Sequence, residues 1–360
     1  MVLIGDILEG QKKSRQPKAT LKKPSAPAPS YTESRQKEIN GLLEKGAFEF
    51  VNASEIPKDS RVFGSRFVDE IKNPGTDKAY EKSRLVIQAY NDQKKDLVLT
   101  KSPTVQRVSQ KIILALVATL KGDKEKPLSL YLRDISQAYV QLRTPLVRDF
   151  YARLPPKLGL PAETILKVVC PLYGVPEAGN HWFQTYHKHH RKQLQMEQST
   201  YDPCLLHTNS NGFAVTPLQT DDTLLLADEK FAAREMKLRK AGFLAKQREK
   251  LTKTNPIKFN GGYITMRGVN ITLTQESHYE NLGTVSPEPV DLTSSRGVTR
   301  KTVMPKGQYI AQRARRAYIA TVCQPEAAFD LSSAVQVTDP SEEDIKKLNR
   351  RLTWQSDNLS

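Results

Sequence analysis

Residues 218–227 read Leu-Gln-Thr-Asp-Asp-Thr-Leu-Leu-Leu-Ala, so Asp221 and Asp222 interrupt an otherwise apolar run. A third carboxylate, Asp134, ends another strand-like run that begins at Leu128. Carboxylates beside apolar strands are costly unless something neutralises them, and a divalent cation commonly does so. Three hard oxygen donors suit Mg²⁺, with Mn²⁺ as the alternative. If the three aspartates converge, they could support two-metal nucleotidyl transfer.

A plainer interpretation of the aspartate pair stays open. Asp-Asp followed by Thr is a common turn composition, because Asp tolerates tight turns and its side chain bonds the nearby backbone. The surroundings of the upstream aspartate favour a functional interpretation. They read Asp134-Ile-Ser-Gln-Ala138-Tyr139, with an alanine and an aromatic residue at the fourth and fifth positions after the acid. Together with the later Asp-Asp, this resembles the paired catalytic motifs of reverse transcriptases.

An ordered series of further segments resembles the copia type of LTR retrotransposon reverse transcriptase over roughly residues 60–335. The segments that carry the resemblance, in chain order, are Ser65-Arg-Phe-Val68, Lys82-Ser-Arg84-Leu-Val86, Ser102-Pro-Thr-Val105, Pro171-Leu-Tyr-Gly174-Val-Pro-Glu177-Ala178 closed by Trp182, Phe259-Asn-Gly261-Gly262-Tyr-Ile264, and Arg316-Ala-Tyr318 to Pro325. One such match alone is weak, whereas the ordered series is specific.

The resemblance implies an α+β right-hand polymerase fold with a mostly antiparallel palm sheet and helices packed on one face. We expect a flexible basic segment at 1–35, fingers at 36–127, a palm with the catalytic aspartates at 128–265, and a partial thumb or connection at 266–360. Acids of the kind that an RNase H domain needs do not follow, so we expect a polymerase fragment of a larger element.

The function that the resemblance implies is RNA-directed DNA polymerisation, with dNTPs added to a primer 3′-hydroxyl on an RNA template. The residues expected to act there are Asp134, Asp221 and Asp222 as catalytic metal ligands, Tyr139, Lys82, Arg84 and Glu177 at the substrate, and Phe259, Gly261 and Gly262 in the primer grip. Tyr139 would exclude a ribose 2′-hydroxyl, or else only pack in the core. Lys82 and Arg84 would meet the triphosphate, since Arg binds phosphate bidentately, or else be solvated strand residues.

The chain departs from the family pattern at several positions. Gln219 stands where the family has the Tyr of Tyr-x-Asp-Asp, Glu177 replaces a Gln near the sugar, and Asn260 replaces a Leu in the primer grip. Pro217 sits in the strand before the aspartate pair, where it cannot donate a ladder hydrogen bond. These departures keep a catalytically decayed nucleic-acid-binding remnant open as an alternative. Another metal-dependent nuclease or nucleotidyltransferase is a further alternative, although it leaves the Tyr-Gly and primer-grip segments unexplained.

Composition indicates a polyanionic partner. The 360-residue chain carries a formal net charge of +16, and a basic protein gains affinity for nucleic acid by releasing counterions from phosphates. We therefore expect RNA template, DNA primer and RNA–DNA hybrid as partners, with other retroelement proteins as further candidates and no membrane partner. Three scattered cysteines indicate a reducing compartment. We expect an intracellular protein, in cytoplasmic virus-like particles or in the nucleus.

Local patterns predict several elements. Turn residues at Asn73-Pro-Gly75 predict a hairpin, and apolar spacing after Ser102 predicts an amphipathic helix with a broad apolar face. Helices are also expected at 38–45, 178–194, 231–241, 309–320 and from 342 to 354, and a loop at 286–300. The cluster from His187 to Lys192 has no carboxylate or cysteine at ligand spacing, which favours an exposed basic helix end over a metal site.

Overall fold

The computed structural model describes residues 30–120, 127–142, 144–155, 161, 163–236, 242–268, 270–276, 282–293 and 300–358. The chain forms two compact units. The first unit contains Met1–Pro103, Ile135–Leu194 and Arg239–Leu244, and the second contains Thr104–Asp134, Gln195–Leu238 and Ala245–Ser360. The chain therefore passes between the units several times, and the predicted fingers and palm ranges each contribute to both. The predicted subdomain boundaries stay predictions.

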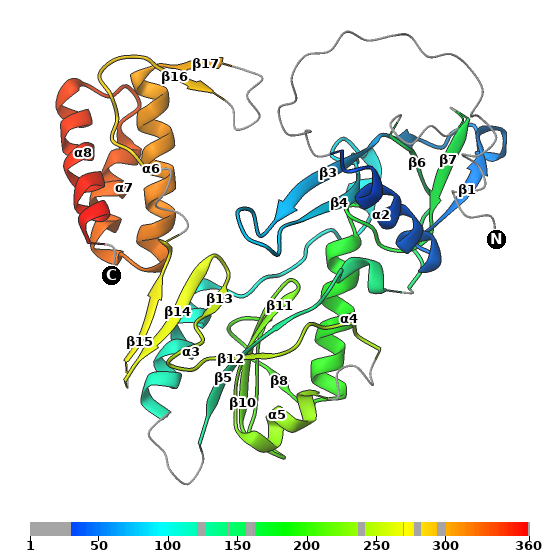
Figure 1. Cartoon of the computed structure of the whole chain (residues 1–360), viewed down its shortest axis with the longest axis horizontal. Coiled ribbons are helices and arrows are strands. Elements are labelled where there is room, and N and C mark those ends of the chain that lie inside the picture. The colour runs from blue at the N-terminus through cyan, green and yellow to red at the C-terminus, as the bar shows by residue number, and fades with distance from the viewer. Residues whose placement is uncertain are drawn as a thin grey trace. The chain divides into compact units, whose positions relative to one another are not determined.

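In its described residues, the first unit combines a β-hairpin and a mixed four-stranded sheet with helices α2 and α4 (Figure 1). Its elements are α2 (Thr32–Glu44), β1 (Phe48–Asn52), β2 (Val62–Phe63), β3 (Ser65–Lys72), β4 (Tyr80–Ile87), β6 (Phe150–Arg153), β7 (Thr164–Val168) and α4 (Ala178–Lys192), with 3₁₀ turns at Ala53–Glu55, Gln93–Leu97 and Tyr139–Gln141. Strands β3 and β4 form the predicted hairpin. One sheet has the order β1-β7-β6-β2, in which only the β2–β6 pair is parallel among the described strands.

The core of the first unit joins these elements. Ile39 and Leu42 of α2 pack in one cluster with Leu85 and Ile87 of β4 and with Leu166 of β7. The Leu-Tyr-Gly segment runs beside β4, where the N–H of Ile87 donates to the carbonyl of Tyr173 at 2.8 Å. Gly174 has a φ of 85°, and a Cβ there would lie 2.0 Å from the carbonyl oxygen of Ile87. Glycine is required at this position because no side chain fits the close approach.

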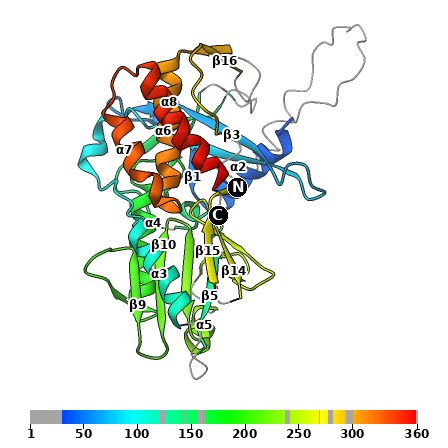
Figure 2. The same ribbon diagram turned by 90° about the vertical axis from the view of Figure 1, so that its left-hand side faces the viewer.

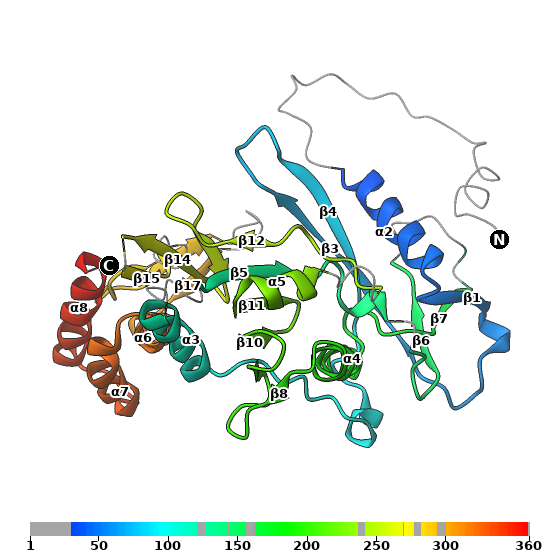
Figure 3. The same cartoon turned by 90° about the horizontal axis from the view of Figure 1, so that it is seen from below.

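The second unit is built on an antiparallel sheet with the order β12-β5-β11-β10-β9-β8. The strands are β5 (Ser129–Asp134), β8 (Glu197–Gln198), β9 (Leu205–Thr208), β10 (Ala214–Gln219), β11 (Asp222–Ala227) and β12 (Glu249–Lys250), and Figure 3 shows β5, β11 and β10 following one another. Helices α3 (Arg107–Leu120) and α5 (Glu229–Glu235) contact this sheet at β10 and β11, respectively.

Asp202 anchors the start of α3 from a distant part of the second unit. It is 1% exposed and accepts hydrogen bonds from the Gln106 N–H at 2.9 Å and the Ser109 hydroxyl at 2.6 Å. Of the broad apolar face predicted for this helix, Ile113 and Val117 are buried while Val108 and Ile112 stay exposed.

A smaller antiparallel sheet and a helical bundle complete the second unit. The sheet contains β13 (Ile257–Phe259), β14 (Gly262–Arg267) and β15 (Asn270–Thr274). Strands β16 (Val290–Thr293) and β17 (Arg300–Val303) pair with each other. Helices α6 (Pro305–Val322), α7 (Ala328–Gln336) and α8 (Glu342–Asp357) lie side by side (Figure 2), with a 3₁₀ turn at Pro325–Ala327. Their shared core includes Tyr309, Leu331 and Leu348.

The expected α+β class is confirmed, and several local predictions need correction. Helix α2 begins at Thr32, inside the segment predicted as flexible; residues 1–29 lie outside the described residues. Strand β16 falls within the predicted loop at 286–300, because alternation of apolar Val290 and Leu292 is too short to stand out in a polar stretch. Helix α5 ends at Glu235, and the rest of its predicted range, 237–241, is not described.

The histidine-rich end of α4 was predicted to be exposed, and that prediction is wrong for its imidazoles. His187 and His189 are 8% exposed and His190 is 2% exposed. His189 and His190 pack against Tyr186, and Phe243 also contacts His189. Packing against aromatic rings thus buries these side chains in the first unit.

None of the helices in the described residues has the length and apolar character needed to cross a membrane.

Candidate catalytic centre

The three aspartates converge in the second unit, and the sheet register brings them together. Asp222, the first residue of β11, lies directly opposite Asp134, the last residue of β5. Opposed antiparallel residues have Cα atoms about 4.5–5.5 Å apart, and opposed side chains point to the same face. Asp221 lies in the tight turn between β10 and β11, where Gln219 is the partner of Asp222. The predicted hairpin and the predicted convergence are both present.

The turn that presents Asp221 carries backbone strain. Thr220 has a φ of 51°, in the left-handed region that β-branched residues rarely adopt. Pro217 stands in β10, as expected, and keeps its place opposite Leu205 of β9. In the pairing of β10 with β11, Val215 lies opposite Leu226 and Leu218 lies opposite Thr223, so the register is the same on both sides of the proline. The proline therefore locally interrupts the pairing without shifting the aspartates out of register.

A cavity of about 440 Å³ opens at these acids. It is lined by Leu132, Asp134, Gln219, Thr220, Asp221, Asp222, Glu249, Lys258, Asn260 and Gly261. Burial, together with the negative charges of Asp221 and Asp134, raises the pKa of Asp222 to about 7. Glu249 acts in the same direction, whereas Lys246 lowers this pKa. The centre therefore concentrates more negative charge than its surroundings neutralise.

Lys246 is a cation in direct contact with one of the acids, Asp134. Its ammonium Nζ lies 2.5 Å from Oδ2 of Asp134, and its backbone N–H donates to the carbonyl of Asp134 at 3.0 Å. Both side chains keep access to solvent, with 64% of Lys246 and 31% of Asp134 exposed. Sequence reasoning missed this lysine, because it lies in an irregular stretch without periodicity.

The donor set at this cavity fits divalent metal ions in its chemistry. It offers several carboxylates, and Oε1 of Gln219 is buried with no hydrogen-bond partner among the described residues. A hydrated cation would satisfy such an oxygen and relieve the repulsion that raises the pKa of Asp222. Within the described parts of the chain, no three His, Cys, Asp or Glu side chains are already gathered as metal ligands. The carboxylate of Asp134 is paired with the ammonium of Lys246, which lies where a metal ion would bind this carboxylate.

The predicted primer-grip hairpin forms a wall of the same cavity. Phe259 pairs with Gly262, so Asn260 and Gly261 make a two-residue turn between β13 and β14. Both turn residues have positive φ, 47° and 78°, and Asn-Gly is a favoured sequence for such turns. The Asn260 that departs from the family pattern thus suits its backbone. A Cβ on Gly262 would lie 2.7 Å from Cδ1 of Leu273, so this glycine permits close packing on β15.

The family Reverse transcriptase (RNA-dependent DNA polymerase) matches residues 48–298 of this chain. This range includes the three acids and the hairpin that was predicted to be a primer grip. The chain belongs to this family. The expected copia-type retrotransposon reverse transcriptase is confirmed, together with membership of an enzyme family of nucleotidyltransferases. Reverse transcriptases in general use divalent metals.

Curated relatives include retrotransposon polyproteins of Saccharomyces cerevisiae. The chain is 29% identical to the Transposon Ty1-LR2 Gag-Pol polyprotein over 203 residues, which are 55% of this chain and 11% of the relative. It is 28% identical to the Transposon Ty1-DR5 Gag-Pol polyprotein over the same length and shares of each chain. The chain thus spans about a tenth of the length of these relatives.

A solved structure of the foamy viral protease-reverse transcriptase in complex with double-stranded DNA has the same fold. It covers 91% of this chain and 48% of its own, with a TM-score of 0.52 and 13% sequence identity. At that identity the likeness shows the fold alone. The expected right-hand polymerase fold is therefore confirmed for this reverse transcriptase.

The substrate-contacting residues expected of the reverse transcriptase all lie in the first unit. Lys82 and Arg84 stand on β4, and Nη1 of Arg84 lies 3.4 Å from a carboxylate oxygen of Glu70 on β3. Tyr139 begins a 3₁₀ turn and contacts Tyr173 edge to face, with ring centroids 5.6 Å apart. Their roles at a nucleotide stay predictions.

Glu177 is buried and held by an arginine. The guanidinium of Arg148 donates to both of its carboxylate oxygens at 2.9 and 2.8 Å, and also lies 2.6 Å from Asp92. Glu177 is 3% exposed, and these carboxylates raise the pKa of Arg148. The charge that Glu177 adds at the place of the family's Gln is thereby neutralised. Arg148 is thus committed to an ion cluster with Glu177 and Asp92.

A second buried ion cluster lies next to the acids and was missed from sequence. Arg133 donates to both carboxylate oxygens of Glu235 at 2.8 Å, and Nη1 of Arg248 reaches Glu235 at 2.9 Å. Arg248 also lies over the ring of Tyr131, 4.1 Å from its centroid. A sequence signal did exist, since Arg133 interrupts an apolar strand, but its partners are about a hundred residues away.

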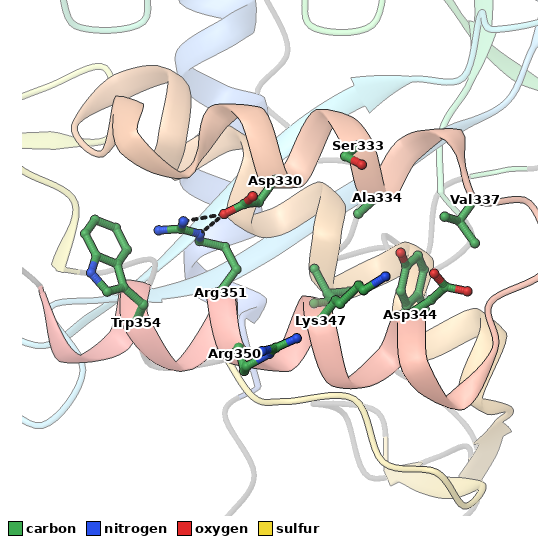
Figure 4. A pocket seen from close by; sticks show the side chains of 11 residues that line it. Asp330, Ser333, Ala334, Val337, Asp344, Lys347, Arg350, Arg351 and Trp354 are labelled. Carbon is green, nitrogen blue, oxygen red and sulfur yellow. Dashed lines mark hydrogen bonds and ion pairs between the residues drawn. The ribbon is translucent and has the colours of Figure 1, made fainter.

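A separate hollow of about 510 Å³ lies in the helical bundle of the second unit (Figure 4). Figure 4 shows Arg351 of α8 reaching Asp330 of α7 across it. Lys347 is bound to Glu343, and the Asp344 carboxylate accepts from Ser341 at the start of α8. The charged side chains that line this hollow largely form ion pairs and hydrogen bonds with neighbouring residues. We therefore place the candidate catalytic centre at the cavity beside the aspartates.

Proposed function

We propose that this chain is the polymerase of a copia-type retrotransposon and extends a DNA primer on an RNA template, using dNTPs. The observation that carries the proposal is the register that sets Asp222 opposite Asp134, with Asp221 in the adjoining turn. All three line one cavity, and their mutual repulsion contributes to the raised pKa of Asp222. Excess negative charge at one point of a sheet is unfavourable for folding alone, and it suits a site that receives cations.

The acids would hold Mg²⁺, or Mn²⁺, through Asp134, Asp221 and Asp222. Ions held there would supply positive charge to the oxygens on which negative charge develops during nucleotidyl transfer. The protein's own part is to fix the carboxylates: β5 and β11 set the spacing, and the strained turn at Thr220 presents Asp221. The Asn260-Gly261 turn on the cavity wall would position the primer end, with Phe259 and Gly262 fixing the hairpin behind it.

Residues of the first unit would bind the nucleotide. Lys82 and Arg84 would contact the triphosphate, and Tyr139 would stack below the sugar and exclude a 2′-hydroxyl. Glu177 lies below the surface in its ion pair with Arg148, so we assign it to shaping this region. The template, the primer and an RNA–DNA hybrid are the proposed macromolecular partners, and the cellular compartment stays a prediction.

A primer-extension assay on poly(rA)/oligo(dT) with dTTP and Mg²⁺ tests the proposal. We expect extension by the full chain, none in EDTA, and none by Asp221→Asn. Salt-sensitive binding of the hybrid without extension would instead indicate a decayed nucleic-acid-binding remnant. Cleavage of labelled RNA or DNA without dNTP would indicate a nuclease. A useful matched control is Asp339→Asn, which changes an acid that is 89% exposed in the bundle and should leave extension unchanged.

A further inference from the structure

Lys246 is held against Asp134 by its backbone as well as by its charge. Its N–H donates to the Asp134 carbonyl at 3.0 Å, while its own carbonyl accepts from Nη1 of Arg133 at 2.8 Å. Both peptide groups of the lysine are therefore tied to two consecutive residues of β5. The ammonium is left within 2.5 Å of Oδ2 of Asp134.

The ion cluster behind β5 makes this arrangement rigid. Consecutive strand residues point to opposite faces of a sheet, so Arg133 and Asp134 present opposite charges on opposite faces. Arg133 is fixed bidentately by Glu235, which also binds Arg248 two residues beyond Lys246. Charge-assisted bidentate contacts of this kind define geometry strongly. The cluster, which lies on the face of β5 away from the acids, thus fixes the stretch 246–248 beside this strand.

Lys258 provides an internal comparison. It lines the same cavity, but its Nζ lies over the ring of Tyr263, 5.3 Å from the centroid. Lys246 instead contacts a carboxylate and lowers the pKa of Asp222. The two lysines carry equal charge near one cavity, and only Lys246 occupies an oxygen that a metal ion would need.

We infer that Lys246 is the resident counter-ion of Asp134 in the metal-free protein, and that a divalent ion must displace its ammonium to bind. Lys246 is then a positioning residue that keeps the acid-rich strands paired before metal arrives and sets the metal affinity of the centre. This inference rests on the proposed metal-dependent function. It adds that metal binding is an exchange of one cation for another.

A titration of the full chain with Mn²⁺ tests the exchange. Binding is measured as the loss of the electron paramagnetic resonance signal of free Mn²⁺. Lys246→Met removes the competing charge and keeps the length of the side chain. It should bind Mn²⁺ about two- to fivefold more tightly, which corresponds to roughly 0.4–1 kcal/mol, the upper part of the range for a partly exposed ion pair. Lys246→Arg keeps the charge and should remain near the wild-type affinity. Lys258→Met should stay within about 1.5-fold, because screening weakens charges that make no direct contact.

Thermal unfolding gives a second readout that does not involve activity. In EDTA, Lys246→Met should melt below wild type, because Asp134 loses its counter-ion. Saturating Mn²⁺ should then raise its melting temperature by more than it raises that of wild type. A lower melting point in EDTA without tighter Mn²⁺ binding would mean that the lysine is only structural, and would overturn the exchange.

Two other outcomes also decide against the inference. Equal tightening by Lys246→Met and Lys258→Met would assign the effect to overall charge, and weaker binding by Lys246→Met would mean that the lysine assists the metal. An Asp222→Asn control separates this inference from the proposed function. If wild type and Asp222→Asn both fail to bind Mn²⁺, the metal site itself is absent and the proposed function fails with it.

Discussion

The two faces of strand β5 treat charge in opposite ways. On one face, Arg133 is 6% exposed and donates two hydrogen bonds to the carboxylate of Glu235. On the other face, the next residue, Asp134, meets Asp222 across the strand pair, with Asp221 beside it. The buried face is paired and the solvent-accessible face carries excess negative charge. Neighbouring residues of β5 thus belong to a buried ion cluster and to the proposed metal centre, respectively.

The first unit also contains a buried ion cluster in which an arginine is paired with carboxylates. Arg148 joins the carboxylates of Asp92 and Glu177, and all three side chains are largely buried. Breaking a buried ion pair leaves an uncompensated charge and is strongly destabilising, whereas an unpaired charge near solvent costs less. The contrast therefore separates residues that are kept for folding from residues kept for chemistry. Substitutions on the two faces of β5 should accordingly affect different measurements.

The largest effect is expected on catalysis. Asp222→Asn removes a proposed metal-binding charge while keeping the size of the side chain, and should lower primer extension by at least about 10³-fold, in the range seen when a key electrostatic group is lost. Its melting temperature in EDTA should not fall, because like-charge repulsion is relieved. Primer extension and thermal unfolding on the same preparation check this. A variant that loses activity only because it unfolds would contradict the contrast.

The buried face should show the opposite result. Glu235→Gln leaves two guanidinium groups without their carboxylate and should destabilise the second unit by about 3–5 kcal/mol. Glu229→Gln on the same helix is the matched control; it is an exposed acid in the first turn and should cost at most about 1 kcal/mol. Urea unfolding followed by tryptophan fluorescence and circular dichroism measures both. Equal stability of the two variants would show that the cluster does not hold the sheet.

Sequence alone located the acids because each lies at the end of a strong apolar run. The apolar runs at 128–134 and 218–227 predicted strands, and the Asp-Asp pair predicted a turn. The expectation that the three acids converge came from the resemblance to reverse transcriptases, and the sheet register brings them together. Helices such as α6 and α8 were also found from their spacing, although α6 extends beyond the predicted range. Local periodicity is sufficient where an element is long and amphipathic.

What the sequence did not reveal depends on contacts between distant residues. Lys246 and Arg248 lie in an irregular stretch. Lys246 contacts Asp134 and Arg133 on β5, and Arg248 contacts Glu235 on α5. The buried histidines of α4 looked exposed because charged residues surround them in sequence, whereas aromatic rings surround them in the fold. Glu177 was expected at the substrate, and the structure ties it to Arg148. Charge pairing and stacking of this kind have no local signature.

A third prediction asks whether the first unit contributes to the same chemistry. If Tyr139 excludes the 2′-hydroxyl, Tyr139→Ala should raise the use of rNTPs relative to dNTPs by about 10- to 100-fold, since a steric clash of roughly 1.4–2.7 kcal/mol is removed. Tyr139→Phe keeps the ring and should retain discrimination. Single-nucleotide extension with dTTP and UTP measures the ratio. Unchanged discrimination in the alanine variant would leave Tyr139 as a packing residue against Tyr173.

A fourth prediction uses the raised pKa of Asp222. Burial, with repulsion from Asp221 and Asp134, raises this pKa to about 7, above the unfolded value of about 3.9. The folded state keeps the proton at pH values where the unfolded chain has lost it, so this contribution to stability is present below about pH 4 and is lost as the pH rises through about 7. In EDTA, the melting temperature of Asp222→Asn minus that of wild type should therefore increase between pH 5 and 8, by on the order of 2–4 °C. Asp339→Asn should show no such trend.

The smallest effect is expected from the chain's diffuse positive charge, which contrasts with the localised negative charge at the acids. With a net charge of +16, affinity for an RNA–DNA hybrid should fall with salt, and log K against log[salt] should slope by about −0.7 to −0.9 per phosphate contacted. Sequence preference should be slight, because phosphate contacts position a duplex without reading its bases. Fluorescence anisotropy with two hybrids of different sequence measures both quantities.

Removing the amino-terminal segment should make that slope shallower without abolishing binding. A deletion of residues 1–29 stops before helix α2, which begins at Thr32. It removes the basic residues Lys12, Lys13, Arg15, Lys18, Lys22 and Lys23. A full-length variant with these residues changed to glutamine should give the same slope as the deletion if charge, and not chain length, is responsible. Salt-independent binding by the intact chain would mean that its basic charge serves another purpose, and the proposed hybrid contact would lose its electrostatic basis.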